Sequence, residues 1–381
     1  MQTVNRQDNY VAFWRGISAQ MVVVGHALNL FYPTMFMLPR GDGGWTAADS
    51  GILYIQNIGV VIFFLISGYI VTKTSLPKAL SGNYDALDFA IDRGTRILAP
   101  LIPAALLIYA LDHAFFRDGE LTSFLKIQLN LPTLIANLTL LFNNPVLALI
   151  SRLFDMEWID VGRIGTAQPF WSVAIEWWIY VAFGILAITW SIRRRFGVLS
   201  LCLFAFAILY SWVLLLKGIA LPLAWVFGSL YCLSENRFRA LPTMAAFVLF
   251  CTTGVVGASS LFVAGFNFYD PLFLCMFSAT FLLGHRIFDG FVSDGRRKLP
   301  AIFNIWSDTS YSIYLLHFSI MTYMLVLRPD GVSPFAMLMA SFLLSNIAAY
   351  LFWLTIERRH GLLRSYMHRL RGNRARFVKP K

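Results

Sequence analysis

The chain has 381 residues, of which 58% are hydrophobic and 13% are charged, and its formal net charge is +11. Soluble globular domains carry about 25% charged residues, so this composition excludes an ordinary soluble enzyme and indicates an integral membrane protein. The positive charge alone would also fit a nucleic-acid-binding protein, and only the distribution of the charge can decide between the two classes.

Apolar stretches of about 20 residues, the length of a helix that crosses a bilayer, recur along the chain. We predict an all-α fold of about ten transmembrane helices around a central polar cavity, at 11–32, 52–73, 93–112, 170–190, 198–216, 219–234, 242–262, 268–286, 306–327 and 334–357. A further apolar segment near 127–150 contains Pro132, Pro145 and several asparagines. We therefore predict that this segment is interfacial or re-entrant.

The lysines and arginines are distributed unevenly around the predicted helices. With a cytoplasmic N-terminus, ten spans place 24 of the 31 basic residues on the cytoplasmic side and seven on the other. This is the asymmetry of the positive-inside rule, so the charge reflects topology and no nucleic acid is predicted as a partner. Both termini are expected in the cytoplasm, with 1–360 as one membrane domain and 361–381 as a basic cytoplasmic tail.

The first predicted span carries two ionisable residues, Arg15 and His26. Eleven positions on a helix correspond to three turns plus about 20°, so both side chains lie on one face, about 16 Å apart along the axis. Ionisable groups at this depth usually line a cavity or pathway. Alternatively, Arg15 extends to the interface and His26 bonds a neighbouring helix.

The third span opens with DRGTRILAP, in which Arg93 and Arg96 are separated by three positions and share a face at the cytoplasmic end. Two guanidinium groups are well suited to binding phosphate. The alternative is that the pair is an ordinary positive flank of a membrane span.

The fourth span begins PFWSVAIEWWIY, where Ser172, Glu176 and Tyr180 follow at intervals of four and form a polar stripe. A carboxylate inside a bilayer needs a partner or a proton, so Glu176 is a functional candidate. The neighbouring residues Trp171, Trp177 and Trp178 are typical of the membrane interface.

The ninth span reads SDTSYSIYLLHFSI and repeats this pattern, with Ser310, Tyr314 and His317 on one face and Tyr311 beside them. We expect the stripes to line a common cavity, whose lining comprises Trp171, Ser172, Tyr180, Ser310, Tyr311, Tyr314 and His317. The four cysteines are isolated in apolar spans, so neither a disulfide framework nor a metal site is predicted.

Six segments together resemble the acyltransferase 3 family of integral membrane acyltransferases. They are RGISAQMVVVGH, GVVIFFLISGYIVT, RGTRILAP, PFWSVAIEWWIYVAF, SYSIYLLHF and IERRH, in this order between residues 15 and 360. The resemblance implies a bacterial cytoplasmic-membrane enzyme that moves an acyl group, most often acetyl, onto a hydroxyl of an envelope carbohydrate. Lipopolysaccharide and exopolysaccharide are examples of such acceptors, and some members of the family act on small molecules.

The resemblance also implies roles for individual residues. His26 corresponds to the catalytic histidine, Arg15 to its partner, and Arg93 and Arg96 to the pair that meets the acyl-CoA donor. After the WS motif this chain has Glu176-Trp177-Trp178-Ile179-Tyr180, which differs from the sequence of many relatives. We therefore include Glu176 among the candidate catalytic residues without assigning it a specific role.

The residues themselves are compatible with this chemistry. Neutral imidazole can take a proton from an attacking hydroxyl near neutral pH, because the reference pKa of histidine is about 6.5. Direct attack by a carbohydrate or lipid-linked carbohydrate and an acyl-enzyme route both remain open. A secondary transporter or flippase would also place arginine, glutamate and histidine inside spans, and its activity would not depend on coenzyme A.

Overall fold

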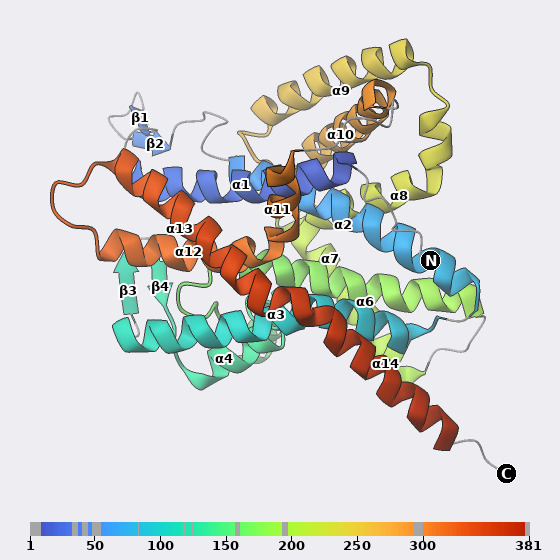
Figure 1. Ribbon diagram of the computed structural model, residues 1–381, viewed down its shortest axis with the longest axis horizontal. Coiled ribbons are helices and arrows are strands. Elements are labelled where there is room, and N and C mark those ends of the chain that lie inside the picture. Colours follow the sequence, from blue (N-terminus) through green and yellow to red (C-terminus); the bar gives the residue numbers. More distant parts are fainter. Residues whose placement is uncertain are drawn as a thin grey trace. The chain divides into compact units, whose positions relative to one another are not determined.

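The computed structural model describes residues 9–32, 37–39, 45–47, 55–82, 84–116, 119–122, 125–156, 161–192, 197–292 and 300–377. These residues form mainly helices (Figure 1), which confirms the predicted helical class. The helices are α1 (Asn9–Phe31), α2 (Ile55–Leu80), α3 (Ala86–Phe115), α4 (Leu131–Leu138), α5 (Pro145–Phe154), α6 (Phe170–Ile192), α7 (Val198–Leu216), α8 (Leu221–Arg239), α9 (Thr243–Val263), α10 (Pro271–Val292), α11 (Ala301–Asp308), α12 (Ser310–Val326), α13 (Pro334–Thr355), the 3-10 helix η2 (Glu357–Arg359) and α14 (His360–Phe377).

Two short antiparallel hairpins depart from the all-α prediction. One pairs β1 (Met37–Pro39) with β2 (Trp45–Ala47), and the other pairs β3 (Gly119–Thr122) with β4 (Leu125–Ile127). Each strand has only three or four residues. The hairpins therefore add little to a fold that is otherwise helical.

The chain forms two compact units, each assembled from separated segments. Unit 1 comprises Met1–Thr74, Leu215–Tyr314 and Tyr323–Asn346. Unit 2 comprises Ser75–Leu214, Leu315–Thr322 and Ile347–Lys381. The predicted tail, 361–381, belongs to unit 2 together with α3 and α6.

Six helical stretches within the described ranges are long and apolar enough to cross a membrane: Ile55–Leu80, Ala86–Phe115, Val198–Leu216, Thr243–Val263, Pro271–Phe288 and Pro334–Arg371. The four other predicted spans coincide with α1, α6, α8 and α12, which do not meet the same criterion of length and apolarity. The protein is therefore an integral membrane protein, whereas the count of ten spans and the central cavity stay predictions.

The interrupted segment near 127–150 carries two short helices, α4 and the start of α5. Asn130 caps α4 by accepting a hydrogen bond from the Thr133 amide (2.9 Å), and Asn144 caps α5 by accepting from Val146 (3.0 Å). Helices of 8 and 10 residues are about 12 and 15 Å long, roughly half of what a bilayer core requires. Neither helix can be a full span, in agreement with the prediction.

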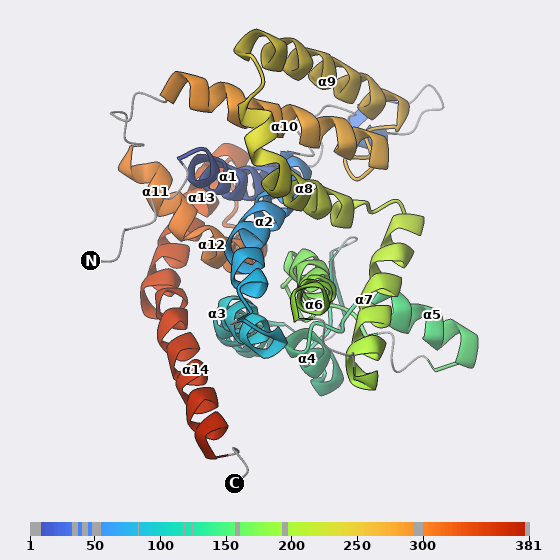
Figure 2. The ribbon, with the colours of Figure 1, turned by 90° about the vertical axis from the view of Figure 1, so that its right-hand side faces the viewer.

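In unit 1, α2 and α8 cross through two glycines. A Cβ atom on Gly68 would lie 2.0 Å from the Trp225 carbonyl oxygen, and one on Gly228 would lie 2.0 Å from the Leu65 carbonyl oxygen. Small residues at such a crossing let two backbones approach closely. In the same unit, α9 and α10 pack side by side (Figures 1 and 2), and α1 packs on α11.

In unit 2, a buried carboxylate holds the loop that leads into α6. Asp112, near the end of α3, is completely buried and accepts hydrogen bonds from the Thr166 amide (2.6 Å) and hydroxyl (3.1 Å). The Thr166 hydroxyl oxygen also lies within hydrogen-bond distance of the Ser319 hydroxyl of α12, at 2.7 Å. These bonds satisfy the buried carboxylate and position the start of α6 against α3.

Candidate functional site

Arg15 of α1 contacts the polar stripe of α12. The Arg15 Nε donates to the Ser310 Oγ at 2.9 Å, and the Ser310 hydroxyl donates to the Ser307 carbonyl at 2.8 Å. Ser307 and Ser310 are both almost completely buried. The structure therefore brings together two of the predicted groups, the first-span arginine and the start of the ninth-span stripe.

His26 lies on the same uninterrupted helix as Arg15, and both side chains are half-buried. The helical geometry that places them on one face therefore holds along the whole interval. Reciprocal hydrogen bonds between Gln20 and Asn346 of α13, at 2.9 and 3.1 Å, fix α1 between the two positions.

The ninth-span residues are divided between the two units. Ser310, Tyr311 and Tyr314 belong to unit 1, where the Tyr314 ring packs edge-on against Phe63 of α2 at 6.0 Å between centroids. His317 belongs to unit 2 and is completely buried. A common cavity for all four residues stays a prediction.

The two arginines of α3 have different partners. The Arg93 Nη2 donates to the Ser75 hydroxyl at 3.4 Å, and its guanidinium lies over the rings of Phe89 and Tyr180. Arg96 instead forms an ion pair with Glu357 of η2, with 3.3 Å between Nη2 and Oε1. Arg93 and Arg96 thus lie on one face of α3, but Arg93 lies against two aromatic rings and Arg96 is paired with a carboxylate.

The stripe on α6 meets the first of these arginines. The Tyr180 hydroxyl donates to the Glu176 Oε1 at 2.6 Å, the contact that a spacing of four on a helix favours. Because the Tyr180 ring also contacts Arg93, the structure connects the stripe of Glu176 and Tyr180 with Arg93, which the sequence placed in a separate group.

The other predicted α6 residues lie near the start of the helix. The Ser172 hydroxyl is buried and donates to the Pro169 carbonyl at 3.4 Å, and Trp171 is half-buried. Trp178, expected at the membrane interface, is buried, and its indole donates to the Leu140 carbonyl at 3.0 Å. Trp178 therefore packs inside unit 2, and its place at the membrane interface stays a prediction.

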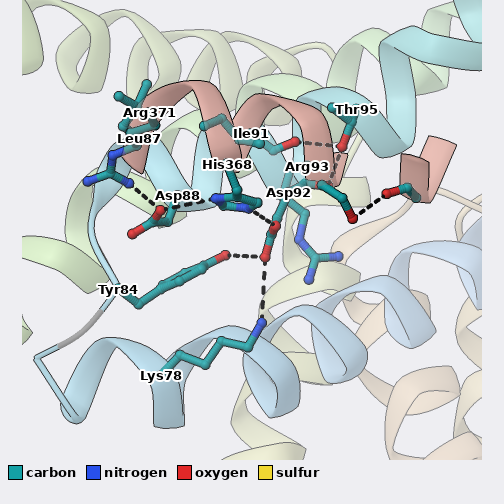
Figure 3. Close-up of polar contacts among 12 residues, drawn as sticks. Lys78, Tyr84, Leu87, Asp88, Ile91, Asp92, Arg93, Thr95, His368 and Arg371 are labelled. Atoms are coloured by element: carbon teal, nitrogen blue, oxygen red, sulfur yellow. Dashed lines mark hydrogen bonds and ion pairs between the residues drawn. The ribbon is translucent and has the colours of Figure 1, made fainter. Parts of the chain in front are cut away.

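The predicted tail forms α14, which packs along α3 through a ladder of ion pairs (Figure 3). Arg371 pairs with Asp85 and Asp88, and His368 contacts Asp88 (3.4 Å) and Asp92 (2.9 Å). Lys78 and the Tyr84 hydroxyl also reach Asp92, at 3.5 and 3.0 Å. The ladder ends one residue before Arg93, so α14 stabilises the part of α3 that carries both arginines.

Asp85 caps α3 at the end of this ladder, just outside the helix. Burial raises the pKa of its carboxyl, but hydrogen bonds from the Asp88 and Leu87 amides and from Arg371 outweigh burial and hold the pKa below its usual value. The charged carboxylate is therefore the form that the folded cap favours.

Sequence reasoning missed Glu357 and the ladder. A signal for the ladder was present, because Asp85, Asp88 and Asp92 recur at intervals of three and four and face a basic C-terminal segment. Glu357 was visible as an acidic residue among the arginines of IERRH, but its partner lies 261 positions earlier in the chain. Within the described ranges, no three His, Cys, Asp or Glu side chains form a group that could hold a metal ion.

A family model described as an acyltransferase domain, acyltransferase 3, matches residues 8–354. No curated protein and no solved structure matches the chain. The matched range includes every candidate residue that the sequence predicted, from Arg15 to His317. Glu357 and α14 lie beyond its end.

Proposed function

Since this chain belongs to the acyltransferase 3 family and is an integral membrane acyltransferase, we propose that it transfers an acyl group from cytoplasmic acyl-CoA to a carbohydrate hydroxyl. The acyl group is most simply acetyl. The acceptor is a carbohydrate of the envelope or one that is exported, free or linked to lipid. The enzyme lies in a bacterial cytoplasmic membrane with both termini in the cytoplasm.

The contact between Arg15 and Ser310 is the observation that carries this proposal. A guanidinium inside a span is costly, and a buried hydroxyl that accepts one of its N–H groups holds it in place. The hydrogen bond keeps the guanidinium on the face of α1 that also carries His26. An anionic substrate that enters beside α1 would meet the arginine first and the imidazole about 16 Å further along the helix.

The donor supplies the anionic groups that these arginines suit. Coenzyme A carries phosphates at one end and the thioester at the end of its long pantetheine arm. Arg93 and Arg96 bind the phosphates on the cytoplasmic side, because guanidinium groups form paired hydrogen bonds with phosphate oxygens.

His26 acts as the general base in a direct transfer. The neutral imidazole takes the proton of the acceptor hydroxyl while the hydroxyl oxygen attacks the thioester carbonyl carbon. The carbon–sulfur bond then breaks, an ester forms, and the departing thiolate receives the proton from the imidazolium. Arg15 contributes a positive charge on the same helix face, where it favours the anionic donor.

The proposal is tested with purified protein in lipid nanodiscs, supplied with acetyl-CoA and with envelope carbohydrate from a strain in which the gene is deleted. We expect free thiol to be released only when both substrates are present, with a gain of one acetyl increment in the mass of the carbohydrate. In sealed vesicles containing the same protein, movement of carbohydrate across the membrane without acetyl-CoA, and with no thiol release, would instead identify a carrier.

A further inference from the structure

The guanidinium of Arg93 occupies a corner formed by two aromatic rings. Its Cζ lies 5.8 Å from the Phe89 ring centroid and 5.9 Å from the Tyr180 centroid. The two rings are 6.4 Å apart and almost perpendicular, with an angle of 83° between their planes. A cation within about 6 Å of a ring centroid is attracted by the negative face of the ring, so both rings hold the arginine.

The sequence of α6 makes room for this corner. Gly184 follows Tyr180 by one helical turn, and a Cβ atom there would lie 2.6 Å from the Phe89 Cδ1. The Phe89 ring can therefore lie directly on α6, where it also packs against Phe183 at 5.8 Å. Phe89 and Tyr180 are 5% and 7% exposed, so both rings are fixed by their surroundings.

Glu176 acts on the second ring of the corner. The hydroxyl of Tyr180 donates to the Glu176 Oε1 at 2.6 Å, a short hydrogen bond. This bond fixes the ring orientation and draws the phenol proton toward the carboxylate. The ring thereby becomes more electron-rich, which strengthens its attraction for the guanidinium.

We propose that Tyr180 and Glu176 are positioning residues for the donor site, which hold Arg93 in its phosphate-binding place without touching the acyl group. The proposal rests on the proposed function, because it assigns the role through the acyl-CoA donor. It gives Glu176 a different role from the catalytic one that the sequence suggested.

This role predicts a particular kinetic signature. Without the Tyr180 ring, the Arg93 guanidinium is still present but can move away from its phosphate-binding position. Donor binding therefore weakens, while the rate of the transfer step changes little. A cation–π contact is worth a factor of about 2–5 at an exposed site and about 30 in a desolvated one, and Arg93 is half-buried. We expect the Tyr180→Leu variant to raise the dissociation constant for coenzyme A and the KM for acetyl-CoA about tenfold, with kcat changed less than threefold.

The test compares matched variants in nanodiscs, by calorimetric binding of coenzyme A and by steady-state thiol release. Tyr180→Phe keeps the ring and loses the bond to Glu176, so it should raise KM less than Tyr180→Leu does. Glu176→Ala should resemble Tyr180→Phe, and combining the two should add nothing further because they break the same bond. Glu176→Gln keeps an acceptor oxygen and should raise KM less than Glu176→Ala does. Tyr210→Leu is the control, since Tyr210 is a buried tyrosine of α7 that stacks near Trp178 and not on Arg93.

Three outcomes would overturn the inference. A Glu176→Gln variant that loses more than 100-fold in kcat at unchanged KM would make Glu176 a catalytic residue. A Tyr180→Leu variant that folds, elutes as a single species and binds coenzyme A as tightly as wild type would show that the ring does not position Arg93. Failure of the wild-type protein to bind coenzyme A at all would instead remove the proposed function, and the positioning role with it.

Discussion

Arg96 of α3 and Glu357 of η2 form an ion pair across 261 positions of the chain, with 3.3 Å between Nη2 and Oε1. The Glu357 side chain is 1% exposed and the Arg96 side chain 30% exposed. A carboxylate this deeply buried needs a compensating charge, and Arg96 supplies it. The end of the last predicted span is thereby joined to the helix that carries the proposed donor site.

Removal of the buried carboxylate should destabilise the protein. We expect Glu357→Ala to lower the free energy of unfolding by about 2–3 kcal/mol, less than for a fully buried pair because Arg96 reaches solvent. Thermal unfolding in detergent, followed by size-exclusion chromatography, measures the effect. The double variant Arg96→Ala and Glu357→Ala should lose less than the sum of the single variants. Strict additivity would show that the two side chains do not interact.

Substitutions of Arg93 and of Arg96 should differ in their effect on the stability of the protein. Arg93→Ala should weaken coenzyme A binding with little loss of stability, whereas Arg96→Ala should weaken binding and also destabilise the fold, because it leaves Glu357 buried without this partner. Lysine should restore only part of the binding at either position, since a point charge lacks the two-pronged geometry. If both alanine variants bind coenzyme A normally in calorimetry, the pair is only a topological flank.

Docking of α14 on α3 should weaken in acid. The pKa of Asp85 is lowered in the folded state, so the stability that its carboxylate contributes is present above the unfolded value, about 4, and is lost as the pH falls through the folded pKa. Hydrogen exchange of the amides of α14 measures this, and their protection factors, taken relative to the intrinsic exchange rate at each pH, should fall as the pH falls below about 4. Asp85→Asn should show faster exchange already at neutral pH. If Asp85→Asn does not change the exchange of the α14 amides, the Asp85 carboxylate does not contribute to the docking of α14 on α3.

The predicted topology places both termini and Arg194 in the cytoplasm. In a variant without the four native cysteines, a single cysteine at position 194 should react with a membrane-impermeant label only after the membrane is opened. A cysteine at position 152, at the end of α5, should react from outside in intact cells. Labelling of position 194 from outside would break the ten-span topology.

Much of the helical framework could be predicted from the sequence, because periodicity and length report directly on helices. The hydrogen bond between Tyr180 and Glu176 could also be predicted, since a spacing of four places both residues on one helix face. The short helices α4 and α5 follow likewise from the local chemistry of Asn130, Pro132, Asn144 and Pro145.

Contacts between helices could not be predicted in the same way. The pairing of Arg96 with Glu357 and of Arg371 with Asp85 depends on which helices are neighbours, and hydropathy carries no information about that choice. For the same reason the sequence indicated a basic C-terminal tail but not that α14 packs on α3. The contact of Arg93 with Tyr180 also joins two helices, and it changes how the role of Glu176 is interpreted.

The central claim is that His26 is the base of a coenzyme A-dependent acyl transfer, and thiol release by a His26→Gln variant tests it most directly. The measurement uses nanodiscs with acetyl-CoA and acceptor at saturating concentrations, with His317→Gln as a second histidine variant for comparison. We predict a loss of about 10²–10⁴-fold for His26→Gln with a wild-type elution profile and thermal stability, because a general base contributes to the reaction and little to packing. A well-folded His26→Gln protein with the wild-type rate of thiol release would contradict the assignment.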